Sequence, residues 1–168
     1  YKAGWDFWAV GGFLAIWTIG YGFIQSFAPT LLKRSQDGLS KEVPEARLWI
    51  VIMIFVPASL LLAFAFHNKL FTSPDLLVVT GLIIFGIPFA LNSSLHSYLI
   101  LAYAGSKKAA EDVGFYYAGN AVGRLIGTLL SGILFQSGGL VACIIGSLVM
   151  LMVCGYFTFR LPISSNKK

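Results

Sequence analysis

Long runs of apolar side chains recur along most of this sequence. Each run is about as long as the roughly 20 residues that a helix needs to cross the hydrocarbon core of a bilayer. The runs lie at residues 8–32, 48–66, 76–104, 113–135 and 140–159. They lack the in-out alternation of a barrel strand, and in lipid only a helix otherwise satisfies its own backbone. The sequence therefore predicts an all-α membrane protein with five transmembrane helices.

Composition excludes several other classes of protein. Of 168 residues, 57% are hydrophobic and 11% are charged, whereas an average soluble domain carries about twice that share of charge. A soluble domain of this length could not bury so much apolar surface. A disordered tail, a coiled coil and a nucleic-acid-binding module are thus excluded. The start at Tyr1 has no features of a signal peptide and predicts a piece of a longer protein.

The basic residues are distributed unequally between the two ends of the predicted helices. Only Lys2 and Lys69 lie on one side, and Arg124 lies within a run. By the positive-inside rule, the richer side faces the cytoplasm. That side holds Lys33, Arg34, Lys41, Arg47, Lys107, Lys108, Arg160, Lys167 and Lys168. We therefore expect a multi-pass protein of the inner (plasma) membrane, with residues 33–47 as a cytoplasmic loop and a cytoplasmic C-terminus. The net charge of +5 then reflects topology, and no nucleic-acid partner is predicted.

Polar side chains are concentrated in three of the five runs. The runs at 48–66 and 140–159 hold almost none and are predicted to face lipid. The other three runs should line a water-accessible path, because polar groups in lipid are costly unless they face protein or water. At about 1.5 Å per residue, their polar side chains lie about 10 to 18 Å from the cytoplasmic ends, close to the midplane. The candidate substrate-binding residues are Tyr21, Gln25, Asn92, His96, Asn120 and Arg124.

Arg124 weighs most in this set, because its guanidinium stays charged under all physiological conditions. Its functional interpretation is capture of an anion through paired hydrogen bonds to carboxylate, phosphate or arsenate oxygens. The alternative is a structural ion pair, whose acid would have to come from other sequence, since no run contains Asp or Glu. His96 could couple transport to protons or simply pack among Ser93 and Ser97. The two asparagines could contact solute or bridge helices.

Small residues recur every fourth position along the fourth run, at Gly119, Gly123, Gly127 and Ser131. Such a ladder predicts close helix packing. Motifs of enzymes are lacking: there is no nucleophile elbow, zinc-binding helix or phosphate-binding loop. A serine beside His96 would have no acid to orient the imidazole. We therefore predict neither an enzyme nor a metal or other cofactor.

Three stretches resemble the ArsJ-type organoarsenical efflux permeases of the major facilitator superfamily. They are GWDFWAVGGFLAIWTIGYGFIQSFAP (4–29), NSSLHSYLI (92–100) and DVGFYYAGNAVGRLIGTLLSG (112–132). The resemblance implies the last five of twelve membrane helices, with the N-terminal half of the transporter missing. The first, third and fourth runs would then be cavity-lining helices. The loop sequence PTLLKRSQDG (29–38) departs from the superfamily's gating motif.

The same resemblance implies secondary active export of 1-arseno-3-phosphoglycerate, and with it arsenate resistance. A partner glyceraldehyde-3-phosphate dehydrogenase would make this cargo from arsenate, and its several negative charges suit Arg124. Two alternatives stay open. One is an exporter of another organic or sugar-phosphate anion, and the other is a non-transporting membrane scaffold.

Overall fold

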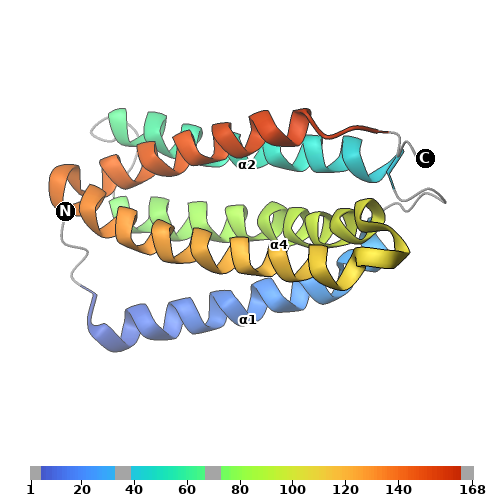
Figure 1. The fold of residues 1–168 in the computed structure, drawn as a ribbon. Helices are drawn as coiled ribbons and strands as arrows, with labels where there is room; N and C mark the ends of the chain where they lie inside the picture. Colours follow the sequence, from blue (N-terminus) through green and yellow to red (C-terminus); the bar gives the residue numbers. More distant parts are fainter. Residues whose placement is uncertain (1–4, 33–38, 67–72, 164–168) are drawn as a thin grey trace.

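Helices make up all the regular structure in the described part of the chain. The computed structural model describes residues 5–32, 39–66 and 73–163. Its helices are α1 (Phe7–Leu31), α2 (Glu42–Ala65) and α4 (Pro74–Phe159), arranged as in Figure 1. Four stretches are long and apolar enough to cross a membrane, which confirms an all-α protein with membrane-span-like helices. They are Phe7–Leu31, Glu42–Ala65, Asp75–Ala104 and Ala109–Phe159.

Although α4 is helical throughout, it folds back on itself. The Cys143 thiol lies 3.5 Å from the Ser131 carbonyl oxygen, whereas a straight helix would separate residues twelve apart by about 18 Å. Between them, Gly139 has a left-handed backbone, with φ at 63°, which an L side chain adopts only at a cost. Residues 97–101 and 113–117 also line one cavity, so the chain reverses between them as well.

We refer to residues 75–104, 109–135 and 140–159 as the first, second and third segments of α4. They cover the last three apolar runs, and residues 136–139, between the last two runs, are helical as well although the chain reverses there. The predicted loop 33–47 is wrong in part, because α2 begins at Glu42. Glu42 and Glu45 favour a helix start through the helix dipole, and Pro44 is tolerated in a first turn. Residues 33–38 of that loop lie outside the described part.

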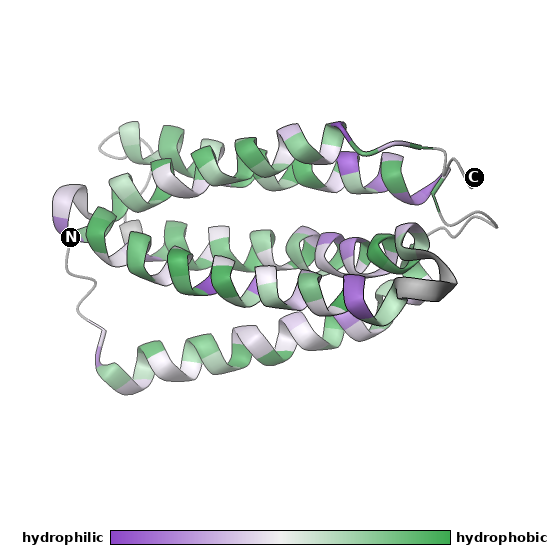
Figure 2. Ribbon diagram, viewed as in Figure 1, coloured by the Kyte–Doolittle hydropathy of each residue, from purple (hydrophilic) through white to green (hydrophobic). Residues whose placement is uncertain are grey.

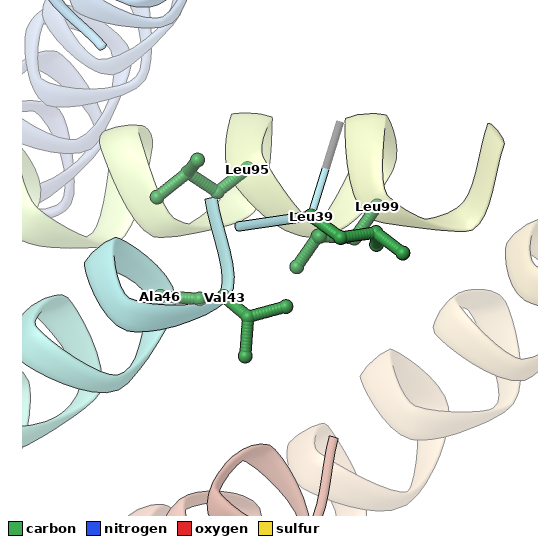
Figure 3. Close-up of a cluster of buried hydrophobic side chains, with 5 residues drawn as sticks. All are labelled: Leu39, Val43, Ala46, Leu95 and Leu99. Carbon is green, nitrogen blue, oxygen red and sulfur yellow. The ribbon is translucent and has the colours of Figure 1, made fainter. Parts of the chain in front are cut away.

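The main hydrophobic contact joins α2 to the first segment of α4. Buried residues recur along α2 every three or four positions, as expected of one helix face. At its start they form a core cluster with the first segment, consisting of Leu39, Val43, Ala46, Leu95 and Leu99 (Figure 3). The opposite face of α2 stays open, with Phe55 67% and Leu62 62% exposed. In Figure 2 the ribbons of α2 and of the third segment are coloured mostly as hydrophobic.

Helix α1 is held mainly by aromatic contacts at its middle. The Trp17 indole donates a hydrogen bond to the Leu82 carbonyl oxygen at 2.8 Å. Gly86 makes room for this ring, since a Cβ there would lie 3.1 Å from the indole nitrogen. One turn further along, Tyr21 contacts Phe89, with 5.2 Å between ring centroids. Only Ala28 of α1 is buried, so this helix adds little to the core.

Two side chains fix the chain where α4 ends. The Arg47 guanidinium, from α2, donates to the carbonyl oxygens of Phe159 and Leu161 at 3.1 and 2.8 Å. The Tyr103 hydroxyl donates to the Pro162 carbonyl oxygen at 2.6 Å. Phe159 ends α4, and Leu161 and Pro162 lie just beyond it. Their carbonyls have no intrahelical donors, so these bonds satisfy groups that would otherwise need water. They also tie the third segment to α2 and to the first segment.

Candidate functional site

The predicted polar layer is carried by α1 and by the first two segments of α4. In α1, Tyr21 and Gln25 are half-buried and lie one turn apart. The Tyr21 ring stacks on Trp17, with 5.9 Å between centroids and 13° between planes, and also contacts Phe89. Because Phe89 lies less than one turn before Asn92, these contacts bring Tyr21 to the level of Asn92.

Asn92 is the most buried of the candidate residues, at 6% exposed. Its side-chain oxygen is buried and has no hydrogen-bond partner. An amide normally does not tolerate this arrangement, because leaving a buried acceptor unsatisfied costs roughly 1–3 kcal/mol. Its backbone oxygen, by contrast, is bonded to His96. Asn92 therefore presents an unsatisfied acceptor inside the first segment of α4.

His96 is bound to its own helix. Its Nδ1 lies 2.9 Å from the Asn92 carbonyl oxygen, and because a carbonyl only accepts, Nδ1 must carry the proton. The Ser97 hydroxyl is held in the same way by the Ser93 carbonyl, at 3.1 Å. The bond of His96 to its own helix favours the packing interpretation of this residue. In the neutral ring it leaves Nε2 as the acceptor that a proton-coupling role would need.

Asn120 and Arg124 lie on the exposed second segment of α4. In residues 5–32, 39–66 and 73–163, no hydrogen bond or ion pair engages the Arg124 side chain; its carbonyl accepts from Thr128 at 2.9 Å. The structure thus brings Tyr21, Asn92 and His96 to neighbouring helical segments. It does not place the Arg124 guanidinium in contact with them.

The small-residue ladder is open over most of its length. At Gly119, Gly123 and Gly127, an added Cβ would meet nothing within 4 Å. Ser131 is the exception, since its carbonyl oxygen accepts a hydrogen bond from the Cys143 thiol of the third segment. Close packing along the ladder therefore stays a prediction, and it concerns contacts outside the described chain.

A mostly apolar hollow, to which four hydroxyl-bearing residues contribute, lies between the first and second segments of α4. Its volume is about 250 Å³, and Ser97, Tyr98, Tyr116 and Tyr117 contribute to its lining. Tyr117, Asn120 and Arg124 follow one another at spacings of three and four, so they share a helix face. This face therefore extends from Tyr117, at the hollow, to the Arg124 guanidinium. Tyr117 belongs with the candidate site, and its spacing from Asn120 was the sequence signal for it.

Two further residues stand out beyond those predicted. Trp17 joins α1 to α4, and the signal for it was a tryptophan far from either end of an apolar run. Asp75 lies in the first turn of α4 and has a buried carboxylate oxygen without a hydrogen-bond partner; no sequence signal separated it from an ordinary helix-start acid. Within the described ranges, no group of three or more His, Cys, Asp or Glu side chains could hold a metal ion.

Comparison with known proteins adds no relative to this picture. Neither a protein-family model, nor a curated protein, nor a solved structure matches the chain.

Proposed function

We propose that this chain is the C-terminal part of a secondary active exporter of small organic anions, with five transmembrane passes. The observation that carries the proposal is Arg124, a permanent charge within a membrane-span-like helix that no acid of the described chain neutralises. Placing such a charge in a bilayer costs roughly 2.5–3.5 kcal/mol on insertion scales. An anionic cargo would offset that cost whenever it is bound.

The neighbouring side chains suit an oxyanion. A guanidinium binds carboxylate, phosphate or arsenate oxygens through two parallel hydrogen bonds. On the same face, the Asn120 amide and the Tyr117 hydroxyl supply further donors. The hollow at Tyr116 and Tyr117 lies toward the end predicted to be cytoplasmic, and there it would serve as an entry for cargo. The resemblance to ArsJ-type permeases makes 1-arseno-3-phosphoglycerate the first candidate, supplied by a glyceraldehyde-3-phosphate dehydrogenase.

The packing suits a part of a larger transporter that moves by alternating access. The second segment of α4 buries little, and its glycine face is open. We propose that this face meets the N-terminal half of the same transporter in the inner membrane. The firmly packed α2 and first segment would form the stationary part against which the second segment moves. His96 Nε2 is the group available for proton coupling.

The test uses the full-length protein in arsenate-challenged cells. We expect Arg124→Ala to abolish arsenate resistance at equal expression, with at least a roughly tenfold loss of organoarsenical transport in vesicles. Arg124→Lys should be nearly as damaging, because an ammonium lacks the planar fork. Arg160→Ala is the matched control, since it removes an exposed arginine whose hydrogen bond is to Tyr156 on the same helix. Unchanged resistance in Arg124→Ala would refute capture of the cargo by this residue.

A non-transporting scaffold is the second candidate, and the open glycine face favours it. In that case the polar residues would join helices of different chains. Both Arg124 variants would then weaken assembly with partner subunits, measured by crosslinking, and vesicles would show no organoarsenical transport even with the wild-type protein. An exporter of another organic or sugar-phosphate anion would instead transport that anion and lose the activity in Arg124→Ala.

A further inference from the structure

A large apolar cavity lies at the end of the molecule where α1 and α4 begin. Its volume is about 450 Å³. The walls come from the start of α1, from the first turns of α4 and from both sides of the turn at Gly139, all at the same end of the bundle (Figure 1). Two aromatic rings of this lining, Trp5 and Phe13, meet edge to face with 6.1 Å between centroids. The cavity thus offers both room and aromatic surface.

One acid lines this otherwise apolar space. Asp75 is half-buried, and its Oδ1 is buried without a hydrogen-bond partner. Its side chain has no salt-bridge partner in the described residues either. A buried carboxylate oxygen needs a hydrogen-bond donor or a positive charge nearby, because leaving it unpaired is costly.

The position of Asp75 at a helix start does not account for this arrangement. Acids in a first helical turn are stabilised by the helix dipole and often accept from free backbone N–H groups. Asp6, the N-cap residue of α1, does so, since its carboxylate accepts from the Ala9 N–H at 2.7 Å. Asp75 makes no such bond. Asp75 lies two residues after the N-cap Ser73, and its buried oxygen does not cap α4.

We propose that this cavity binds an organic cation, an ammonium group on an apolar body, with the Asp75 carboxylate as its counter-ion. The apolar body would occupy the space between Val79, Leu82 and Phe135, and the aromatic rings would favour the charge through their faces. The same chemistry could be supplied by a soluble amine or by the headgroup of phosphatidylethanolamine. This site is independent of anion export and of Arg124.

The test measures binding of two matched probes to the full-length protein in dodecyl maltoside. 1-Naphthylmethylamine is cationic at neutral pH, and 1-naphthylmethanol is its neutral counterpart. Equilibrium dialysis against protein-free micelles corrects for partition into detergent. We expect the wild-type protein to prefer the amine roughly tenfold or more. In Asp75→Asn the two probes should bind equally, with the affinity for the alcohol unchanged.

Two further variants serve as controls for this result. Asp6→Asn removes the same charge from the same end of the bundle and retains a helix cap, so it should keep the preference for the amine. Val79→Phe fills the cavity without touching the carboxylate and should lose both probes, which tests the site even if Asp75→Asn fails to fold. Equal binding of the two probes to wild-type protein, or an undiminished preference in Asp75→Asn, would overturn the proposal.

Competition between the amine probe and added lipids identifies the source of the cation. If the occupant is a lipid, phosphatidylethanolamine added to the micelles displaces the amine from wild-type protein and phosphatidylglycerol does not. If neither lipid displaces the amine, the site takes a soluble cation. Either result supports the site.

Discussion

Two arginines of this chain, Arg47 and Arg124, have the same charge in opposite surroundings. Arg47 is half-buried, lies 5.7 Å over the Phe159 ring and satisfies two carbonyls at the end of α4. Arg124 is exposed on a helix, and its side chain has no partner within the described residues. A guanidinium that satisfies helix carbonyls stabilises a fold, whereas one left available is suited to binding a ligand. The two residues therefore call for different measurements.

At Arg47, the expected effect is on stability. Arg47→Met keeps the apolar stem and removes both hydrogen bonds, so we expect a loss of about 1–3 kcal/mol, as for bonds to charged groups. Thermal unfolding of the full-length protein in detergent measures this loss. Arg160→Met, at an exposed position, should stay within about 0.5 kcal/mol of wild type. Equal stability of Arg47→Met and wild type would show that these bonds contribute nothing.

At the scale of helices, the sequence was a good guide to where spans lie and a poorer guide to where helices begin and end. The run predicted at 8–32 is α1, Phe7–Leu31. The run at 48–66 missed the start of α2 at Glu42, because hydropathy detects the part of a helix that suits lipid and not the polar turns before it. Helicity also continues through the turn at 136–139. In such a turn a single positive φ at Gly139 redirects the chain.

The contact between α1 and α4 depends on a glycine. Gly86→Ala would place a Cβ 3.1 Å from the Trp17 indole nitrogen and strain its bond to Leu82. Gly20→Ala is the matched control, because a Cβ there meets nothing within 4 Å. Both changes gain the same helix propensity. We therefore expect Gly86→Ala to be less stable than Gly20→Ala by about 1 kcal/mol in thermal unfolding.

A second background makes this test specific to the ring. With Trp17→Ala in place, the indole is gone and the difference between the two glycine variants should vanish. A difference of the same size in both backgrounds would mean that Gly86 acts through something other than Trp17.

For the molecule as a whole, counting residues along each helix predicted a common depth for the polar side chains, but not which way each one faces. Contacts of Tyr21 with Phe89 agree with the predicted level of Asn92. The direction of the Arg124 side chain depends on how the second segment is rotated about its axis. Counting residues along the chain does not give this rotation. The buried, unpartnered oxygens of Asn92 and Asp75 likewise arise from packing in three dimensions.

Orientation in the membrane is testable at this scale. In a background with Cys143→Ser and Cys154→Ser, we expect Ser137→Cys to react with a membrane-impermeant maleimide added to intact cells. Ile163→Cys, exposed just beyond the C-terminal end of α4, should react only after permeabilisation. Both expectations follow from the excess of basic residues on the side of the C-terminus. The reverse pattern would invert the proposed topology and the direction of transport.

The near absence of burial along the second segment of α4 has a practical consequence for genetics. Side chains there contribute little to the cohesion of the bundle, whose core is formed by α2 with the rest of α4. Replacements at Asn120 or Arg124 should therefore leave the packing of α2 against the rest of α4 intact. A phenotype that they cause would then reflect contacts of the second segment with the proposed cargo or the proposed N-terminal half, and not damage to this core.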